Sequence, residues 1–311
     1  MSIPPTVPET HDRSGDDARD EIRRVGLRHL LANAGRRLHA ADGTSYARAL
    51  GLSSVLSLLP GLIAVVGVVT ALHLESRGIL SRAVENLAPG PAGSFLTSGV
   101  QNASSSLRVV LWGLGGVLLS GTFAMLHLER GANRIYGVDE HRPGRRRFLT
   151  AAALASTAGL LLLLALGVIV AGEANDGGDG VSVWALIRWP VAVVLVAVAM
   201  TAIFRYAPNR RQPALPWLLS GTSVAVALWI GVTLLLGLVY ENLAALGSSF
   251  GPVLGVIALL VWAYLTGVAV LYGLAFAAEL ESERAGQGEP ERESESEIVD
   301  LRDRDEPAVQ R

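Results

Sequence analysis

The sequence predicts an all-α, polytopic membrane protein with six transmembrane helices and with both termini in the cytoplasm. Half of the 311 residues are hydrophobic, and the mean hydropathy is +0.41. Charged residues make up 17% of the chain, whereas about a quarter is typical of soluble domains. These two observations indicate a chain that faces lipid. A third, the alternation of arginine-rich and arginine-poor connections, indicates its topology.

The first predicted span is residues 49–72, which run for 24 residues without a charge. About 20 apolar residues are enough to cross ~30 Å of hydrocarbon. Pro60 lies near the middle of the stretch, where a proline removes one backbone hydrogen bond. The hydroxyls of Ser53, Ser54 and Ser57 are candidate replacement partners for the freed carbonyl. We therefore expect a helix that is kinked at Pro60.

Five further apolar stretches have the length of a membrane span: 109–128, 148–172, 181–204, 214–240 and 251–278. The N-terminal region and the connections after the second and fourth spans are rich in arginine. The connections after the first, third and fifth spans carry few basic residues or none. Because arginine is enriched in cytoplasmic connections, the alternation predicts six spans with both chain ends inside the cell.

Outside the membrane domain, assigned to residues 46–281, the chain is polar. Residues 1–18 are Pro-rich and lack the apolar stretch of a signal peptide, so they predict a disordered tail. Residues 19–45 have the periodicity of a basic amphipathic helix. Such a helix either lies in the membrane interface, with its arginines near anionic headgroups, or packs beneath the bundle. Residues 282–311 are acidic, poor in apolar side chains and predicted to be disordered.

No motif for catalysis, for a cofactor or for a metal ion is recognisable. The chain has no cysteine, and its six histidines do not have the spacing of metal ligands. It also lacks a Walker loop, a dinucleotide fingerprint and a G-x-S-x-G motif. Buried ionisable groups mark many functional sites in membranes, and the predicted spans contain almost none. We expect a protein that is not an enzyme, with no cofactor, no metal and no nucleic-acid partner.

Four stretches of the chain resemble one known family. They are S-V-L-S-L-L-P-G-L at 54–62, G-A-N-R-I-Y-G-V at 131–138, Y-A-P-N-R-R at 206–211, and L-L-V-W-A-Y-L-T-G at 259–267, with A-A-E-L-E closing at 281. With these motifs the chain, from about residue 20 to residue 281, resembles the YihY/BrkB family of bacterial inner-membrane proteins.

The resemblance implies a multi-pass protein of the bacterial plasma (inner) membrane with a role in cell-envelope integrity or virulence-associated resistance. It implies no settled molecular activity. The family was formerly labelled ribonuclease BN, which is regarded as a misassignment. The residues independently disfavour a nuclease, because phosphodiester cleavage calls for metal-binding carboxylates or a histidine pair in an accessible cleft.

The motifs single out nine candidate functional or structural positions: Ser57, Pro60, Asn133, Arg134, Tyr136, Pro208, Asn209, Arg210 and Glu279. Glu279 is assigned to the inner end of the last span as an interface anchor. The predicted topology places the second and third motifs on the same cytoplasmic side. We therefore expect them to form one basic surface, which either contacts anionic lipid headgroups or anchors helices.

Two classes of function follow. The first is an envelope-maintenance protein that acts through partner proteins. The second is a transporter or flippase for a lipid-like or amphiphilic substrate, not coupled through a buried carboxylate, in which the kinked helix and its Gly-rich neighbours form a lateral groove. A groove lined by Ser57 and Pro60 would favour transport, and a packed bundle would favour the structural role. Membrane lipids are the expected partners in both, and the oligomeric state is left open.

Overall fold

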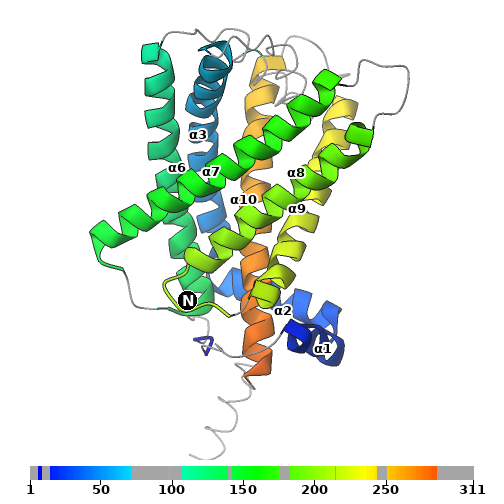
Figure 1. Ribbon diagram of the computed structural model, residues 1–311. Coiled ribbons are helices and arrows are strands. Elements are labelled where there is room, and N and C mark those ends of the chain that lie inside the picture. The colour runs from blue at the N-terminus through cyan, green and yellow to red at the C-terminus, as the bar shows by residue number, and fades with distance from the viewer. Residues whose placement is uncertain are drawn as a thin grey trace, which may run out of the picture.

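The computed structural model describes residues 6–8, 15–71, 98, 107–138, 142–175, 183–213, 215–243 and 251–285. Regular structure in these ranges is entirely helical, with long helices in a bundle and two short helices across one end (Figure 1). The short helices are α1 (Gly15–Val25) and α2 (Leu27–Ala40); the long ones are α3 (Gly43–Ala71), α6 (Leu107–Tyr136), α7 (Gly144–Asn175), α8 (Val183–Tyr206), α9 (Leu215–Leu243) and α10 (Gly251–Arg284).

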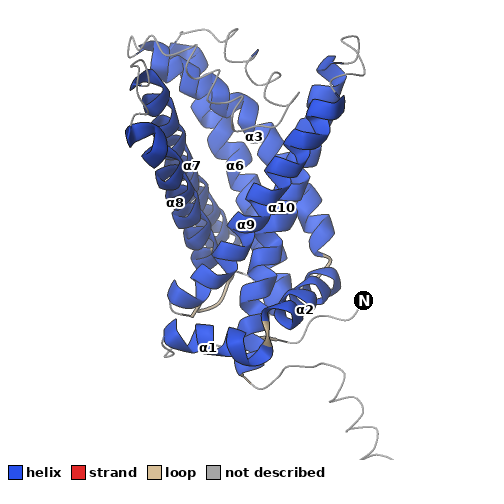
Figure 2. Cartoon of the chain, turned by 90° about the vertical axis from the view of Figure 1, so that its right-hand side faces the viewer, coloured by secondary structure: helices blue, strands red, loops and turns tan. Residues whose placement is uncertain are grey.

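The long helices alternate in direction. Helices α3, α7 and α9 run away from the end that carries α1 and α2, and helices α6, α8 and α10 run back toward it (Figure 1). We call this the basal end; Figure 2 shows α1 and α2 lying beneath the bundle there. The first described residues and the end of α10 are both basal, so the two described chain ends share one side of the bundle.

Five helices of the described residues are long and apolar enough to cross a membrane: Val110–Tyr136, Gly144–Ile169, Leu186–Tyr206, Trp217–Tyr240 and Leu254–Arg284. This makes the chain a polytopic membrane protein of the all-helical class. The first predicted span, 49–72, lies largely within α3 and is not among the five. Many side chains of the second half of α3 lie outside the described residues.

The helix ends differ from the predicted spans at the basal end. The second span was expected to stop at residue 128, but α6 continues to Tyr136. Helix α7 begins at Gly144, before the predicted start at 148. The sequence prediction ended each span where charged residues begin. The structure continues these helices because their charged turns are packed and hydrogen-bonded within the basal end.

The N-terminal region also differs from the prediction. The structure has two helices where one amphipathic helix was predicted, and they are separated at Gly26. This residue has a φ of 91°, which glycine adopts readily and other residues rarely. Helix α2 packs against α10 with Leu30, Ala34 and Leu38 buried. Of the two interpretations of this region, packing beneath the bundle is therefore the one that accounts for the buried face of α2.

Parts of both predicted tails are ordered. Residues 6–8 contact the basal end, and α1 already begins at Gly15, within the expected 1–18 tail. Helix α10 continues to Arg284, into the expected 282–311 tail, and Ser282 is buried. Residues 286–311 and the connection 72–106, apart from Ser98, lie outside the described residues.

Glycines bring helix backbones into contact at the crossings. A Cβ on Gly113 would lie 2.9 Å from the Pro60 carbonyl oxygen, and one on Gly116 would lie 2.9 Å from the Pro60 Cβ. A Cβ on Gly221 of α9 would lie 2.5 Å from the Gly273 oxygen of α10. At these positions glycine is explained by the close packing of neighbouring backbones.

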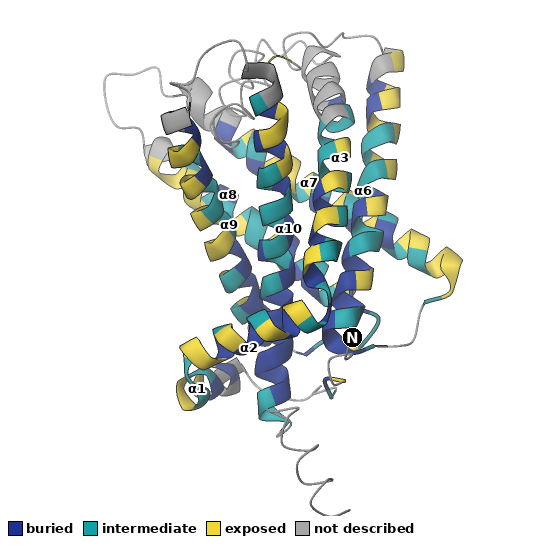
Figure 3. Cartoon of the chain, turned by 180° about the vertical axis from the view of Figure 1, so that it is seen from behind, coloured by how far each residue is buried: buried dark blue, intermediate teal, exposed yellow. Residues whose placement is uncertain are grey.

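Burial is uneven along the bundle. Figure 3 shows buried residues gathered toward the basal end, while exposed residues cover the outward faces of the long helices. Many exposed side chains are large and apolar, such as Trp112 on α6, which is 82% exposed. In a membrane protein these side chains face lipid, which is as apolar as they are. The tightly packed and polar part of the molecule is therefore its basal end.

Candidate functional site

Buried and partly buried charged side chains meet at the basal end, and we call them the basal cluster. Its members are Arg37, Glu129, Arg142, Arg147, Arg210, Glu279 and Glu281, together with the ring of Tyr136. They come from α2, α6, the α6–α7 and α8–α9 connections, the first turn of α7, and α10. Segments far apart in the sequence are therefore joined at one place.

The first pair joins α2 to α10. The Arg37 Nε donates to the Glu279 Oε2 at 2.7 Å, and both side chains are nearly fully buried. Another nitrogen of Arg37 donates to the carbonyl of Ile135, in the last turn of α6, at 3.4 Å. Arg37 thereby ties three helices together. Glu279, expected as an interface anchor, is instead a buried partner of this arginine.

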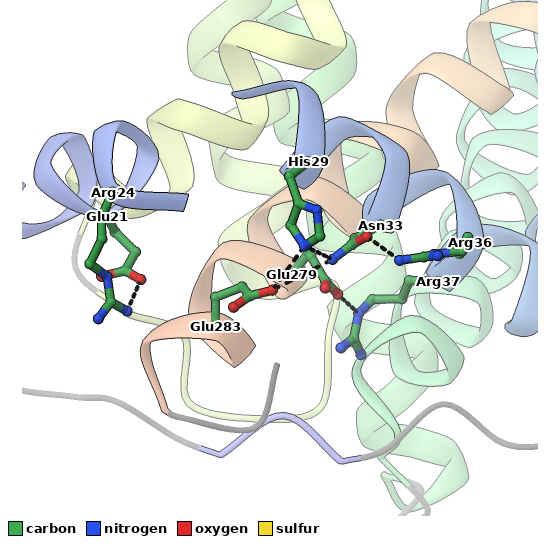
Figure 4. A network of polar contacts seen from close by, with 8 residues as sticks. All are labelled: Glu21, Arg24, His29, Asn33, Arg36, Arg37, Glu279 and Glu283. Carbon is green, nitrogen blue, oxygen red and sulfur yellow. Dashed lines mark hydrogen bonds and ion pairs between the residues drawn. The ribbon is translucent and has the colours of Figure 1, made fainter. Parts of the chain in front are cut away.

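Polar contacts on either side of this pair extend the junction between α2 and α10 (Figure 4). The Asn33 amide is 3.1 Å from the His29 Nε2 and 3.5 Å from the Glu283 Oε1. The Tyr272 hydroxyl donates to the Leu31 carbonyl at 2.6 Å. Helix α2 is therefore docked through polar contacts as well as through its apolar face.

The second pair joins the α8–α9 connection to α10. The Arg210 Nη2 donates to the Glu281 Oε1 at 2.8 Å, with the two side chains 3% and 1% exposed. The Arg210 guanidinium also lies over the Tyr136 ring, 4.7 Å from its centroid, in a cation–π contact. Arg210 is thus enclosed by α6, by α10 and by residues 7 and 8, to whose carbonyls it also donates.

The third group surrounds Glu129 on α6. Arg147 donates to one of its oxygens at 3.3 Å, and Arg142 lies 3.6 Å from the other. Arg142 also donates to the carbonyls of Tyr206 and Pro208 at 3.0 and 2.9 Å, at the C-terminal end of α8. Burial lowers the pKa of Arg142, and the Glu129 carboxylate opposes that shift. The guanidinium is charged at neutral pH, because its usual pKa is above 12.

The family-like motif at 131–138 forms the end of α6. Gly137 has a φ of 66°, the Val138 N–H donates to the Asn133 carbonyl at 2.9 Å, and the Gly137 N–H donates to the Arg134 carbonyl at 3.3 Å. These two bonds and the left-handed glycine form a Schellman C-cap. The Asn133 side-chain oxygen accepts a bond from the Asn209 N–H at 2.7 Å. This hydrogen bond therefore joins the motif at 131–138 to the motif at 206–211.

The structure brings six of the nine candidate positions to the basal end around this cap and pair: Asn133, Tyr136, Pro208, Asn209, Arg210 and, through Arg37, Glu279. Arg134 is in the same turn of α6 and half-buried. Ser57 and Pro60 lie apart from them on α3. The Ser57 hydroxyl donates to the Ser53 and Ser54 carbonyls at 3.1 and 2.8 Å. These bonds are made to the turn before Pro60. They are not made to the Leu56 carbonyl, whose usual N–H donor is missing because residue 60 is proline.

Sequence reasoning missed several members of the cluster. Arg37, Glu129 and Glu281 lie outside the predicted spans, in segments that were read as polar, so the expectation about ionisable residues within the spans did not address their burial. Gly137 carried a usable signal, because glycine is typical just past a helix end and predicts that α6 extends to Tyr136. The pairing of arginines with carboxylates more than 70 residues away left no local signal.

The arrangement is suited to fastening helices. Each of its three carboxylates has an arginine partner. Among the described residues no group of three or more histidines, aspartates or glutamates could hold a metal ion. A buried pair is also intolerant of losing one partner, since an unpaired charge in the interior costs several kcal/mol. The cluster therefore fixes the relative positions of the helix ends it joins.

Comparison with known proteins places the chain among bacterial membrane proteins. It is 28% identical over 243 residues to the putative ribonuclease-like protein YfkH of Bacillus subtilis, covering 75% of this chain and 88% of that protein. It is 27% identical to a UPF0761 membrane protein of Aromatoleum aromaticum and 26% identical to one of Pseudomonas aeruginosa. These matches cover 76% and 75% of this chain but 60% and 57% of the relatives' lengths. No solved structure matches the chain.

The model of the family described as virulence factor BrkB matches residues 34–298. This range includes the motifs of α3, α6, the α8–α9 connection and α10, and all members of the basal cluster. The resemblance found in the sequence is thus confirmed: the chain belongs to the BrkB virulence factor family.

Proposed function

We propose that the protein is a non-enzymatic scaffold of the bacterial plasma membrane that contributes to cell-envelope integrity through partner proteins. The observation that carries the proposal is the packing of Pro60. Its ring and carbonyl fill the notch made by Gly113 and Gly116 on α6, where added Cβ atoms would come within 2.9 Å. The position that a lateral groove would use is occupied by a helix contact, which supports the structural role over transport.

The proposal includes six spans, with α3 as the first. Helix α3 has 29 residues, is free of charge after Arg48, and makes its most extensive contact with α6, beside which it runs in Figure 1. A helix that is a lateral neighbour of a span over this length has the same depth in the bilayer. Six spans agree with the two described chain ends lying on one side.

The basal end is proposed to face the cytoplasm and to contact anionic lipid headgroups. Exposed arginines surround it: Arg23, Arg28, Arg36, Arg48, Arg130, Arg145 and Arg146. Arginines close to an anionic membrane surface each contribute about 1 kcal/mol of attraction. The positive-inside tendency supports the same orientation. In this proposal the exposed arginines meet lipid, and the buried arginines of the basal cluster fasten helices.

The experiment compares two glycines of α6 in a bacterial host that lacks its own family member. Gly116→Leu places a side chain against Pro60, whereas Gly115→Leu points into open space, with no atom within 4 Å of the added Cβ. We expect the wild type and Gly115→Leu to restore resistance to detergent and dye entry, and Gly116→Leu to fail although it reaches the membrane. Equal complementation by both variants would contradict the scaffold proposal.

A reconstitution assay separates the scaffold from the transporter. Purified protein in vesicles of phosphatidylethanolamine and phosphatidylglycerol, with fluorescent lipid in the inner leaflet, is expected to leave the rate of lipid exchange between leaflets unchanged. Exchange that rises with protein density and disappears in Gly116→Leu would favour a flippase instead.

A further inference from the structure

Three residues at the N-terminus are bound to the basal end as an extended segment, which we call the strap (Thr6–Pro8). The Val7 N–H donates to the Tyr136 carbonyl at 3.1 Å, and the Thr6 hydroxyl donates to the Gly137 carbonyl at 3.1 Å. Arg210 donates to the carbonyls of Val7 and Pro8 at 3.1 and 3.2 Å. Four hydrogen bonds thus hold three residues, and three of the four use the strap's backbone.

The groups that receive the strap are fixed by the rest of the fold. The last carbonyls of a helix have no partner within the helix, and the turn at Gly137 leaves those of Tyr136 and Gly137 for another segment. Arg210 is held by Glu281 on one side and by the Tyr136 ring on another. Its guanidinium therefore presents its remaining N–H groups to the strap in one orientation.

The strap also fills an apolar position. Val7 is 3% exposed and belongs to the main hydrophobic core of the described residues. A residue before proline is restricted to extended conformations, so Pro8 favours the backbone shape in which Val7 is bound. Less conformational freedom is then lost on binding, which is the usual gain from preorganisation. The backbone bonds and the Val7 contact together have the form of extended-peptide recognition.

We propose that Tyr136, Gly137 and Arg210 form a binding site for an extended peptide of the pattern Thr-Val-Pro. The chain's own strap occupies the site, and a peptide of the same pattern from another protein binds it in exchange. The site requires a hydroxyl at the first position, a β-branched apolar side chain at the second and proline at the third. The proposal does not depend on the scaffold function, because it rests on the strap contacts alone.

The test uses the full-length protein in detergent with Val7→Asp, which makes the chain's own strap a poor ligand by placing a charge in the core position. A fluorescent peptide with the sequence of residues 1–10 is titrated into this variant and into the wild type. We expect saturable binding to Val7→Asp and at least tenfold weaker binding to the wild type, whose site is occupied. A peptide that itself carries Val7→Asp is expected to bind roughly 10- to 100-fold more weakly, since it loses a buried valine contact.

A milder variant, Val7→Gly, removes the side chain without adding a charge and replaces Val7→Asp if the latter does not fold. Hydrogen exchange on the wild type provides a second measurement: the Val7 amide is expected to be protected, and protection is expected to fall when excess peptide is added. The proposal would be overturned by equal peptide affinity for wild type and variants, by equal affinity of the two peptides, or by an unprotected Val7 amide.

Discussion

The buried pair between Arg210 and Glu281 is the sharpest target for mutation. Arg210→Met keeps an unbranched side chain of similar length but removes the charge, so Glu281 remains buried at 1% exposure without this partner. Removing one member of a buried pair costs about 3–5 kcal/mol. At about 2–3 °C per kcal/mol in a chain of this size, Tm is expected to fall by roughly 6–15 °C.

The assay is thermal unfolding in one detergent at one protein concentration, followed by tryptophan fluorescence. Glu281→Gln is expected to destabilise as well, and the double variant to lose less than the sum of the single losses, by at least about 1 kcal/mol. Arg145→Met is the matched control, because Arg145 is exposed on α7 and its loss should change stability by less than about 0.5 kcal/mol. Additive losses, or a fall in Tm for Arg210→Met no larger than for the control, would refute the pairing argument.

Two further variants test the contacts around the cluster. Asn133→Ala removes the acceptor of the Asn209 N–H bond and is expected to cost about 1–3 kcal/mol, whereas Asn133→Asp keeps an acceptor and should lose less; equal thermal stability of the two would contradict a stabilising role of this hydrogen bond. Gly221→Val places its Cβ against the Gly273 carbonyl and is expected to separate α9 from α10 and lower Tm, while Gly231→Val, with open space around its Cβ, should leave Tm unchanged in the same assay.

The membrane-spanning parts of the fold could be predicted from the sequence because a bilayer imposes one length and one composition on every span. All but the first residue of the predicted span 214–240 therefore falls within α9, and the predicted span 251–278 falls within α10. The basal end obeys no such rule. Glu129 lies among charged residues that are typical of a loop. It is buried within the protein, where it is paired with Arg142 and Arg147.

The same limit applies to the candidate positions. Asn133 and Asn209 were singled out as members of two motifs on one side, and the structure joins them by a hydrogen bond. Their partners were not predictable, since the bond that fixes Arg210 depends on a carboxylate that is 71 residues away in the chain. Pro60 was expected to kink its helix because proline removes a backbone hydrogen bond. Its packing depends on Gly113 and Gly116 of α6, a helix that the residues around Pro60 do not identify as its neighbour.

The pairing of Arg37 with Glu279 has a consequence for synthesis of the chain. The two residues are separated by 242 positions, and Arg210 likewise awaits a carboxylate of α10. Chains emerge from the ribosome N-terminus first, so both arginines are made before the acidic groups that neutralise them. A chain that stops short of α10 contains both arginines but neither of these two carboxylates. Both ion pairs can therefore form only in a chain that has been translated through Glu281.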